Sequence, residues 1–406
     1  MKFYFPDSQD QVSPSYDFPN DEHSPFRVRQ RDDLYAHQAV TPAPYEGILV
    51  SKAIVDGSAK GAGKYTTPQR ERLYRLGVRD FFRLPKEMSS LGDCGAFNYI
   101  DEEIPPYSVN EVLDFYEGCG FDEGVSIDHV IFGYAPGAAE SDVDQAWVTR
   151  RRISLKLAED FISAVEARGN KIEPLGAAQG WSPASYADSV VRLQEMGYKR
   201  IALGGMVPLR TPEIMDCLDK INEVRDRDTN LHLLGITRIN SMEKFFERGV
   251  SSFDSTSAFR QAFMDERNNY HTADRTYTAI RVPQVDGNPM LKRLILAGAV
   301  SQAAAIKGER ECLQALRAYG KREAKLPEAV AALDNYLTLV DETKKQKYLT
   351  SYEETLDDRP WEDCSCLLCK ALGIEIVIFR GSERNKRRGF HNMTVLEAKM
   401  RGLQFA

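Results

Sequence analysis

The chain has 406 residues, a mass of 45.8 kDa and a formal net charge of −7 at pH 7. A chain of this length can bury a large core and is near the upper limit of one domain, so we expect a barrel with additions or two domains. The acidic balance excludes a globally positive field, and any contact with nucleic acid must therefore come from local basic patches.

No apolar run in the sequence approaches the roughly 20 residues of a membrane span, and the N-terminus lacks the pattern of a signal peptide. Outside one C-terminal cluster the cysteines are scattered singly, at positions 94, 119, 217 and 312. Such cysteine usage is typical of a reducing compartment. We therefore expect a cytoplasmic protein without a membrane contact.

Residues 1–45 are rich in Asp, Pro, Ser and Tyr and show little periodicity, which predicts an N-terminal arm rather than a domain. The segment GSAKGAGKYT (57–66) is similar to a phosphate-binding loop. The pattern G-x-x-x-x-G-K-[ST] fails, however, because position 58 is Ser and Tyr65 follows the lysine. We expect a flexible loop at this place.

From residue 46 onward, short apolar runs alternate with amphipathic stretches. This alternation predicts parallel βαβ units, and roughly seven or eight of them fit a (β/α)8 TIM barrel better than an open sheet. A Rossmann fold is the alternative, but no G-x-G-x-x-G segment follows a predicted strand. We expect the barrel and its active site within residues 46–262, with helices over ranges such as 144–168 and 184–197. The expected strands are residues 48–55, 78–84, 127–133, 172–178, 200–206, 231–237 and 251–255.

Residues 263–345 depart from this alternation. The ranges 289–305 and 308–320 are rich in apolar residues and alanine, and an apolar stripe at helical spacing runs from Leu333 to Val340. The pattern predicts a mostly helical insertion in the α/β chain. We expect its apolar stripe to pack on the barrel, and a surface for a partner or substrate is the alternative.

Three cysteines and a histidine near the C-terminus have the spacing C-x-C-x2-C-x21-H. Three thiolates and an imidazole complete a tetrahedral site, so we expect a structural Zn²⁺ ion without an open position for water. Unrelated thiols and a surface histidine are the alternative, but so tight a cluster is rare in a chain with few cysteines. We assign residues 346–406 to a zinc-binding subdomain with a C-terminal helix. The predicted ligands are Cys364, Cys366, Cys369 and His391.

Conspicuous polar and glycine residues fall at or just after the ends of the predicted strands. In a parallel barrel these ends converge on one mouth, so residues distant in sequence become neighbours there. Several carboxylates in one pocket would repel one another and raise the pKa of at least one, leaving a protonated acid beside an ionised partner. Taken singly, each is an ordinary residue at a strand end. The set comprises Asp93, Asp128, Gln179, Gly204, Gly205 and Asp254.

Several segments resemble motifs of the tRNA-guanine transglycosylase superfamily. GDCGAF (92–97) is similar to that family's D-S-G-G-F/Y segment, and QG (179–180) to its base-contacting Gln-Gly. GGM (204–206) is similar to its Gly-Gly-Leu turn, and GVSSFDS (249–255) to its nucleophile strand G-V-D-x-F-D. With the cysteine and histidine cluster, these segments cover most of residues 78–392.

The resemblance implies that Asp254 is a nucleophile, which attacks C1′ of a nucleotide, expels guanine and holds the sugar as a covalent ester. It also implies that Asp93 is the general acid and base for the departing and incoming bases. A carboxylate suits the nucleophilic role because it is ionised at neutral pH and leaves readily when the new base attacks. We predict no role for His129 or His232, since a buried, hydrogen-bonded histidine is the commoner case.

A flipped-out guanine presents its N1–H and N2–H2 donors, which the Asp128 carboxylate would accept. By position, the resemblance places Phe97 and Leu234 on the two faces of the base, although core packing is equally expected for each. Gln179 and the backbone of the Gly-Gly turn at 204–205 would reach O6 or the substituent at position 7, where glycine permits close approach.

Two sequence differences from the tRNA enzymes indicate which nucleic acid is the substrate. Their nucleophile strand continues into a P-T-R-x-G-R segment that grips tRNA, whereas STSAFRQAF (255–263) shares only Arg260. The segments 5–18, 44–51 and 77–85 resemble the DNA-modifying, DpdA-type branch of the superfamily. The resemblance therefore implies exchange of guanine in DNA for a 7-deazaguanine base, 7-cyano-7-deazaguanine, and it makes a partner ATPase a further expectation. The alternatives are a divergent tRNA-guanine transglycosylase acting on tRNA and a catalytically silent nucleic-acid-binding subunit.

Basic clusters at residues 27–31, 150–152 and 384–388 interrupt the acidic chain. Each could neutralise backbone phosphates, which would make binding fall steeply with salt. For the second cluster we favour a solvated helix surface. We expect the third cluster to contact DNA. The predicted nucleic-acid contacts are Arg260, Lys386, Arg387 and Arg388.

Overall fold

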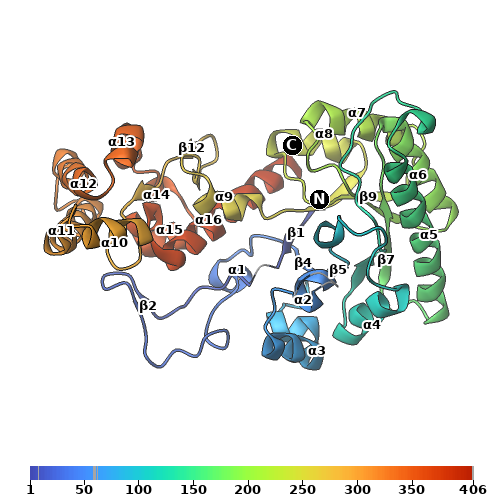
Figure 1. Ribbon diagram of the computed structural model, residues 1–406, viewed down its shortest axis with the longest axis horizontal. Coiled ribbons are helices and arrows are strands. Elements are labelled where there is room, and N and C mark those ends of the chain that lie inside the picture. The colour runs from blue at the N-terminus through green and yellow to red at the C-terminus, as the bar shows by residue number, and fades with distance from the viewer. Residues whose placement is uncertain (8, 58–60, 62, 405–406) are drawn as a thin grey trace. The chain divides into compact units, whose positions relative to one another are not determined.

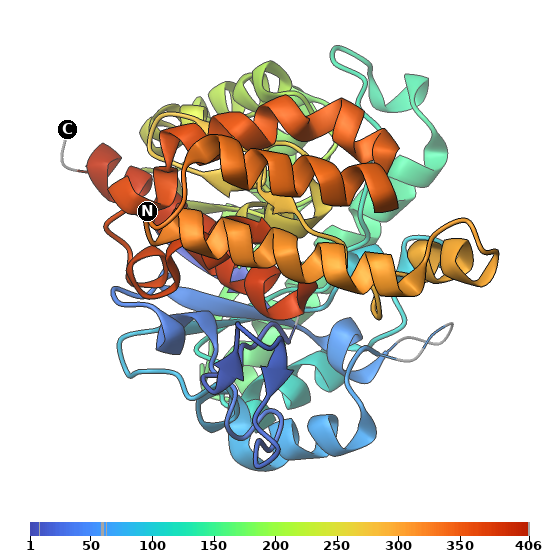
Figure 2. The ribbon, with the colours of Figure 1, turned by 90° about the vertical axis from the view of Figure 1, so that its left-hand side faces the viewer.

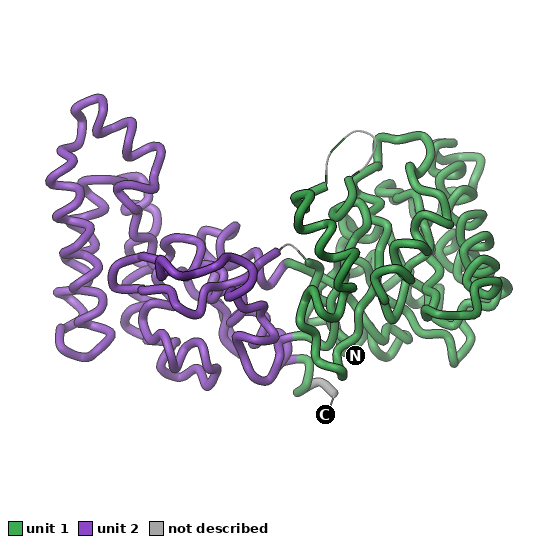
Figure 3. The backbone as a smooth tube through the Cα atoms, turned by 90° about the horizontal axis from the view of Figure 1, so that it is seen from below, with its two compact units in different colours: residues 1–8, 45–256, 400–406 green, residues 9–44, 257–399 purple. Residues whose placement is uncertain are grey.

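The computed structural model forms two compact units, which Figure 3 colours separately. The first unit comprises Met1–Ser8, Tyr45–Thr256 and Met400–Ala406, and the second comprises Gln9–Pro44 and Ser257–Lys399. Each unit therefore combines stretches that are far apart in sequence. The structure describes residues 1–7, 9–57, 61 and 63–404.

The first unit contains a closed barrel of parallel strands in the order β1-β10-β9-β8-β7-β6-β5-β4, and helices surround the strands (Figure 1). From β4 to β9, each strand is followed along the chain by a helix and then by the next barrel strand. This is the architecture of a TIM barrel, so the predicted fold class is confirmed. The strands are β1 (Lys2–Pro6), β4 (Gly47–Ser51), β5 (Ser89–Asp93), β6 (Glu123–Val125), β7 (Glu173–Ala178), β8 (Arg200–Leu203), β9 (Asn230–Leu233) and β10 (Val250–Asp254).

Strand β1 closes the barrel, because Tyr4 lies opposite Asp254 of β10 on one side and Gly47 of β4 on the other. The Tyr4 ring fills the barrel interior, and its hydroxyl donates to Oε1 of Glu123 at 2.8 Å. A Cβ atom on Gly47 would lie 2.7 Å from this ring, so a glycine is needed for the ring to fit. The buried interior cluster comprises Tyr4, Leu49, Leu91, Val125, Leu175, Ala177 and Ala202.

The helices of the first unit begin at residues that satisfy their free backbone N–H groups. At α4, the Ser108 backbone N–H donates to Glu111 Oε2 at 2.7 Å, and the Glu111 N–H donates to Ser108 Oγ at 3.3 Å. This capping box fixes the start of the helix. The helices are α2 (Lys52–Asp56), α3 (Thr67–Phe82), α4 (Val109–Cys119), α5 (Gln145–Ala167), α6 (Pro183–Glu195), α7 (Thr211–Asn222) and α8 (Met242–Glu247).

The second unit is mainly helical. Helices α11 (Gln302–Gly320), α12 (Leu326–Val340) and α13 (Glu342–Asp358) lie side by side (Figure 2). Helices therefore occupy the range for which the sequence predicted them, after the last barrel strand, and α13 continues beyond residue 345. The remaining elements include α1 (Ala36–Ala39), α9 (Ser257–Met264), α10 (Pro289–Leu296), α14 (Pro360–Asp363), α15 (Leu367–Leu372), α16 (Gly381–Gln404) and the strand pairs β2 (Tyr16–Asp17) with β3 (Glu22–His23), β11 (Tyr270–His271) with β12 (Thr276–Tyr277), and β13 (Ile280–Arg281) with β14 (Ile378–Phe379).

Two predicted strands were wrong. Residues 78–84 lie largely in α3, where Leu73, Val78 and Phe82 bury at helical spacing, so the aromatic run belongs to a helix. Residues 127–133 contain no strand, because the barrel strand in this part of the chain is β6, which ends before them at Val125. Strand β5 was missed, since its sequence SSLGD has little apolar character.

The expected arm over residues 1–45 is also corrected, because residues 2–6 form barrel strand β1. Residues 9–44 belong to the second unit together with 257–399, so the predicted boundary between barrel and insertion at 262/263 is displaced as well. Of the loop expected at 57–66, residues 58–60 and 62 lie outside the described residues. Among the described helices, none has the length and apolar character needed to cross a bilayer.

Candidate active site and metal centre

The three aspartates predicted from the strand ends meet at one mouth of the barrel. Asp93 is the last residue of β5, Asp254 is the last residue of β10, and Asp128 follows β6. The negative charges of Asp128 and Asp254 both act on the Asp93 carboxyl. The structure therefore brings together side chains that are up to 161 positions apart in the sequence, from Asp93 to Asp254.

The Asp93 carboxyl is positioned to gain and lose a proton near neutral pH. Burial, followed by repulsion from Asp128 and Asp254, raises the pKa of Asp93 to about 7. Ser51 Oγ donates a hydrogen bond to Asp93 Oδ2 at 2.7 Å, which opposes this shift and fixes the carboxyl. A carboxyl with this pKa can act as both acid and base at neutral pH.

Asp254 is held through one of its two carboxylate oxygens. Oδ1 accepts hydrogen bonds from the backbone N–H of Gly235 at 2.9 Å and from Nε2 of His232 at 3.2 Å. Oδ2 accepts none from the described part of the chain. Asp254 is only 6% exposed. Because the two hydrogen bonds to Oδ1 fix the orientation of the carboxylate, they also fix the direction in which Oδ2 points.

His232 is itself held in a defined orientation. Its Nδ1 lies 2.9 Å from Oγ of Ser252, which is its partner in the pairing of β9 with β10. If the ring is neutral, a proton on Nε2 donates to Asp254 and the Ser252 hydroxyl donates to Nδ1. Ser252, His232 and Asp254 thus form a chain of hydrogen bonds inside the barrel.

Asp128 sits in a separate network with Gln179. Its Oδ2 accepts from Gln179 Nε2 at 2.5 Å, and its Oδ1 lies 3.3 Å from the Cys94 thiol. The backbone N–H of Ile131 donates to Gln179 Oε1 at 3.1 Å, which fixes the amide orientation. Burial raises the pKa of Asp128, while the bonds from Gln179 and Cys94 lower it.

The two predicted glycines leave room beside this network. A Cβ atom on Gly204 would lie 2.2 Å from Gln179 Nε2. Gly205 has a positive φ of 76°, and a Cβ atom there would lie 2.3 Å from the Ile131 carbonyl oxygen. Neither position can accept a side chain without displacing the pocket wall.

The two predicted base-covering residues differ in their surroundings. Phe97 is 52% exposed and its ring centroid lies 5.3 Å from that of Phe132, so an aromatic face is open to solvent. Leu234 is half-buried and packs against the interior cluster of the barrel. Both residues belong to the barrel unit, as do the three aspartates.

The predicted metal ligands converge in the second unit. The ligand atoms of Cys364, Cys366, Cys369 and His391 all lie within 4.8 Å of one another. Nδ1 of His391 is 3.7, 3.4 and 3.3 Å from the three sulfurs, in chain order. Cys366 and Cys369 come from the start of α15, whereas His391 comes from α16. The cluster can bind one metal ion, and a set of three sulfurs and one nitrogen suits zinc.

Neighbouring groups orient the histidine of this cluster. Its Nε2 lies 2.8 Å from the carbonyl oxygen of His271, which leaves Nδ1 facing the sulfurs. The Tyr270 ring stacks on the His391 ring with centroids 4.2 Å apart, and its hydroxyl lies 3.2 Å from Cys369 Sγ. Such outer contacts fix the tautomer and direction of a metal-binding imidazole.

No protein-family model matches the chain. A DNA-guanine transglycosylase from Salmonella montevideo is 48% identical over 400 residues, which cover 98% of this chain and 95% of that protein. The chain belongs to the DNA-guanine transglycosylase family. The resemblance drawn from the motifs is thereby confirmed, and so is the expectation that the chain is a transglycosylase enzyme.

The arginines of the third basic cluster are buried, whereas its lysine, Lys386, is half-buried. Arg388 is fully buried and donates to the carbonyl oxygens of Ala262, Ile376 and Ile378. Arg387 is also buried and pairs with Glu383. The prediction that Arg387 and Arg388 contact nucleic acid was therefore wrong.

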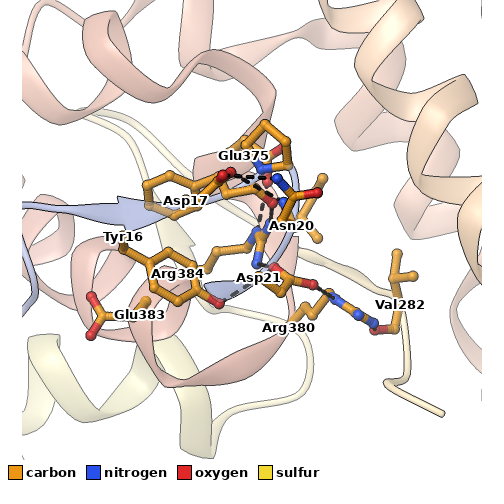
Figure 4. A network of polar contacts seen from close by, with 12 residues as sticks. Tyr16, Asp17, Asn20, Asp21, Val282, Glu375, Arg380, Glu383 and Arg384 are labelled. Carbon is orange, nitrogen blue, oxygen red and sulfur yellow. Dashed lines mark hydrogen bonds and ion pairs between the residues drawn. The ribbon is translucent and has the colours of Figure 1, made fainter. Parts of the chain in front are cut away.

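Helical periodicity explains why these arginines are buried. Arg384, Arg388 and His391 are spaced i, i+4 and i+7 on α16, so the face that carries the metal ligand also buries these arginines. Arg384 is paired with Asp21 and with Glu375, within the network drawn in Figure 4. The helical spacing of Arg384 and Arg388 relative to His391 was the sequence signal that could have predicted their burial.

The two other predicted contacts remain accessible. Arg260 is exposed on α9. Lys386 is half-buried, and its Nζ donates to the Gln11 carbonyl oxygen at 3.1 Å. In the second cluster, the expected solvated helix surface holds only for Arg152, which is exposed. Arg151 is buried and Arg150 is half-buried, and both donate hydrogen bonds to neighbouring groups of the barrel unit.

His232 is the site residue to which we assigned no role. Nothing in the sequence marks it, because only the register between β9 and β10 places it beside Ser252 and Asp254. His129 is the buried, hydrogen-bonded histidine that we expected. Its Nε2 lies 2.7 Å from the Glu102 carbonyl oxygen.

Proposed function

We propose that the chain replaces guanine in DNA by a 7-deazaguanine base, 7-cyano-7-deazaguanine, through a covalent ester between Asp254 and the deoxyribose. The observation that carries the proposal is the pairing of two unlike carboxyls at the barrel mouth. Asp93 has a pKa of about 7, and Oδ2 of the nearby Asp254 accepts no hydrogen bond from the described residues. The name of the relative from Salmonella montevideo supports DNA as the polymer and guanine as the base.

In the first half-reaction, Asp254 Oδ2 forms a bond to C1′ while the bond from C1′ to N9 of guanine breaks. The electron pair of that bond goes to the base, and the protonated Asp93 supplies the proton that neutralises it. In the second half-reaction, Asp93 takes the proton from N9 of the incoming base. N9 then attacks C1′, and the ester bond breaks to restore the Asp254 carboxylate.

His232 acts in this scheme as a positioning residue. Its contact with Asp254 Oδ1 leaves Oδ2 as the attacking atom. Because a hydrogen bond to a carboxylate stabilises its negative charge, the same contact favours departure of Asp254 from the ester. The Ser252 hydroxyl keeps the required tautomer.

Base recognition is proposed for the Asp128 and Gln179 network. An ionised Asp128 can accept the N1–H and N2–H2 groups of guanine or of a 7-deazaguanine. Gln179, oriented by the Ile131 N–H, and the backbone at Gly204 and Gly205 line the side toward O6 and position 7. Phe97 would cover one face of the base and Leu234 the other.

Zn²⁺ is the proposed metal at the cysteine and histidine cluster. All four ligands come from the protein, so a bound zinc ion would join α15 to α16 and contribute folding energy rather than chemistry. A partner ATPase that opens the duplex is a further proposal. Arg260, which is exposed, is a proposed contact for a backbone phosphate.

The test supplies radiolabelled 7-cyano-7-deazaguanine with either duplex DNA or tRNA, with and without the partner ATPase if one is encoded beside the chain. Retention of label in DNA supports the proposal, and retention in tRNA alone supports the tRNA enzyme instead. Loss of incorporation in Asp254→Ala, with DNA binding preserved, separates catalysis from a silent binding subunit.

A further inference from the structure

The loop of residues 22–33 carries an unusually exposed aromatic side chain. Phe26 is 88% exposed, the highest value for a large apolar side chain among the described residues. Val28, two positions later, is exposed as well, and arginines occupy positions 27, 29 and 31 between and beside them. An apolar tip among cations is unusual on a chain with a net charge of −7.

The loop is held in shape by its own acidic residues. Both oxygens of the buried Asp33 accept from Arg27, at 2.6 and 2.7 Å, and Oδ2 also accepts from the Gln30 N–H at 3.2 Å. Asp32 Oδ2 accepts from the Val28 N–H at 2.7 Å. The exposed tip is therefore presented on an ordered loop, which lowers the entropy cost of binding a partner.

A polar pocket of about 250 Å³ lies beside the same loop. Its basic lining comes from Arg27, Arg29 and Lys386, and its acidic lining from Asp33 and Glu383. Both carboxylates are already engaged, Asp33 by Arg27 and Glu383 by Arg387 and by the Ser13 N–H. Arg29 is exposed and forms no ion pair with any residue that the structure describes.

We propose that this loop binds duplex DNA, with Phe26 inserting between base pairs and Arg29 and Lys386 binding a backbone phosphate in the pocket. The inference rests on the proposed function, because an enzyme that attacks C1′ behind a guanine must first take that guanine out of the stack. Apolar side chains that insert between base steps unstack a duplex, and neighbouring cations neutralise the phosphates. Because both carboxylates of the pocket are already paired, its basic side chains favour an anion such as a DNA phosphate.

The exposed side chain of Leu296 offers a matched control. It is 87% exposed and lies in the same unit, on α10, but no residue of that helix lines the polar pocket. If exposure alone weakened DNA binding on truncation, Leu296→Ala would behave like Phe26→Ala. Arg310, exposed on α11, serves in the same way for Arg29.

The experiment measures binding to duplexes that carry 2-aminopurine beside a guanine. Wild type and Leu296→Ala should raise the 2-aminopurine fluorescence, whereas Phe26→Ala should weaken duplex binding about tenfold and abolish most of the rise. Binding to single-stranded DNA should change less than about twofold, because no stack has to be opened. Arg29→Ala should reduce the slope of log K against log salt by about one, and Arg310→Ala should not.

Equal fluorescence and affinity in Phe26→Ala and wild type would overturn the proposal, as would a loss confined to tRNA. The readout requires no base exchange and can be repeated in the Asp254→Ala background. The two possible failures are therefore distinguishable. If Phe26 does not insert, Phe26→Ala leaves base exchange on duplex DNA unchanged. If the transglycosylase proposal fails, wild type incorporates no base.

Discussion

Nε2 of His232 lies 3.2 Å from Oδ1 of Asp254, and the backbone N–H of Gly235 reaches the same oxygen at 2.9 Å. One oxygen of the proposed nucleophile is thus bound twice, while the other accepts no hydrogen bond from the residues that the structure describes. The carboxylate is oriented before substrate arrives, so the protein has already met part of the cost of aligning the attacking atom.

This contact predicts a kinetic effect of replacing His232. His232→Phe keeps an aromatic ring but removes the donor, and we expect kcat to fall about 10- to 100-fold with little change in KM. His232→Gln can place an amide donor near the Nε2 position and should recover part of the rate. Single-turnover rates for the three proteins provide the measurement. Equal losses in both variants would show that His232 serves packing alone.

The raised pKa of Asp93 predicts opposite pH dependence for the two half-reactions. Release of guanine needs the protonated acid, so its rate should fall as pH rises through about 7. Incorporation needs the ionised base, and its rate should rise over the same interval. Rapid-quench measurements of each half-reaction between pH 5.5 and 8.5 (roughly the range in which such a group titrates) test this. Parallel profiles for both steps would contradict the assignment.

Asp93 also predicts a stability effect with a defined sign. Its pKa is raised from 3.8 to about 7 in the folded protein, so folding favours the protonated form. That stabilisation is complete below 3.8 and is lost as pH rises to about 7. Asp93→Asn should therefore have a higher Tm than wild type at pH 8, and the difference should shrink at pH 4. A constant difference across these pH values would argue against a raised pKa.

The metal centre predicts about one zinc ion per chain in the purified protein. Cys366→Ala should lose most of the metal and destabilise the second unit, because it removes one ligand that joins α15 to α16. Elemental analysis with thermal unfolding tests both effects. Cys312→Ala, a buried cysteine outside the cluster, is the control that should retain the metal. A metal content that Cys366→Ala leaves unchanged would contradict the site.

Arg388 predicts loss of stability rather than loss of DNA contacts. Arg388→Ala would leave the carbonyl oxygens of Ala262, Ile376 and Ile378 without their buried donor, at a cost of about 2–4 kcal/mol in unfolding free energy. Denaturant unfolding measures that cost. The salt dependence of DNA binding by the folded variant should match wild type, and a reduced slope would restore Arg388 as a phosphate contact.

The sequence predicted the carboxylates that meet at the barrel mouth and the cysteine and histidine cluster because both patterns depend on residue type and local spacing. Asp93, Asp128 and Asp254 follow strand ends, and strand ends of a parallel barrel must converge. Cys364, Cys366 and Cys369 lie within six residues of one another in sequence. Neither inference required knowledge of which strands pair or which helix face is buried.

The features that the sequence did not predict depend on tertiary contacts, which no local pattern contains. Strand β1 was assigned to an arm because its pairing partners, β4 and β10, lie about 45 and 250 residues further along the chain. His232 gained a role only from its register against Ser252. For Arg388, the charge suggested solvent, but the position of His391 one turn away fixed the inward face of α16.

The covalent intermediate provides the most direct test of the central claim. Wild type would be mixed with guanine-containing duplex DNA, denatured, digested with nuclease and protease, and analysed by mass spectrometry. The account predicts a deoxyribose adduct on the peptide that contains Asp254, and none in Asp254→Ala. Base exchange that continues in Asp254→Ala, or an adduct on a different residue, would contradict it.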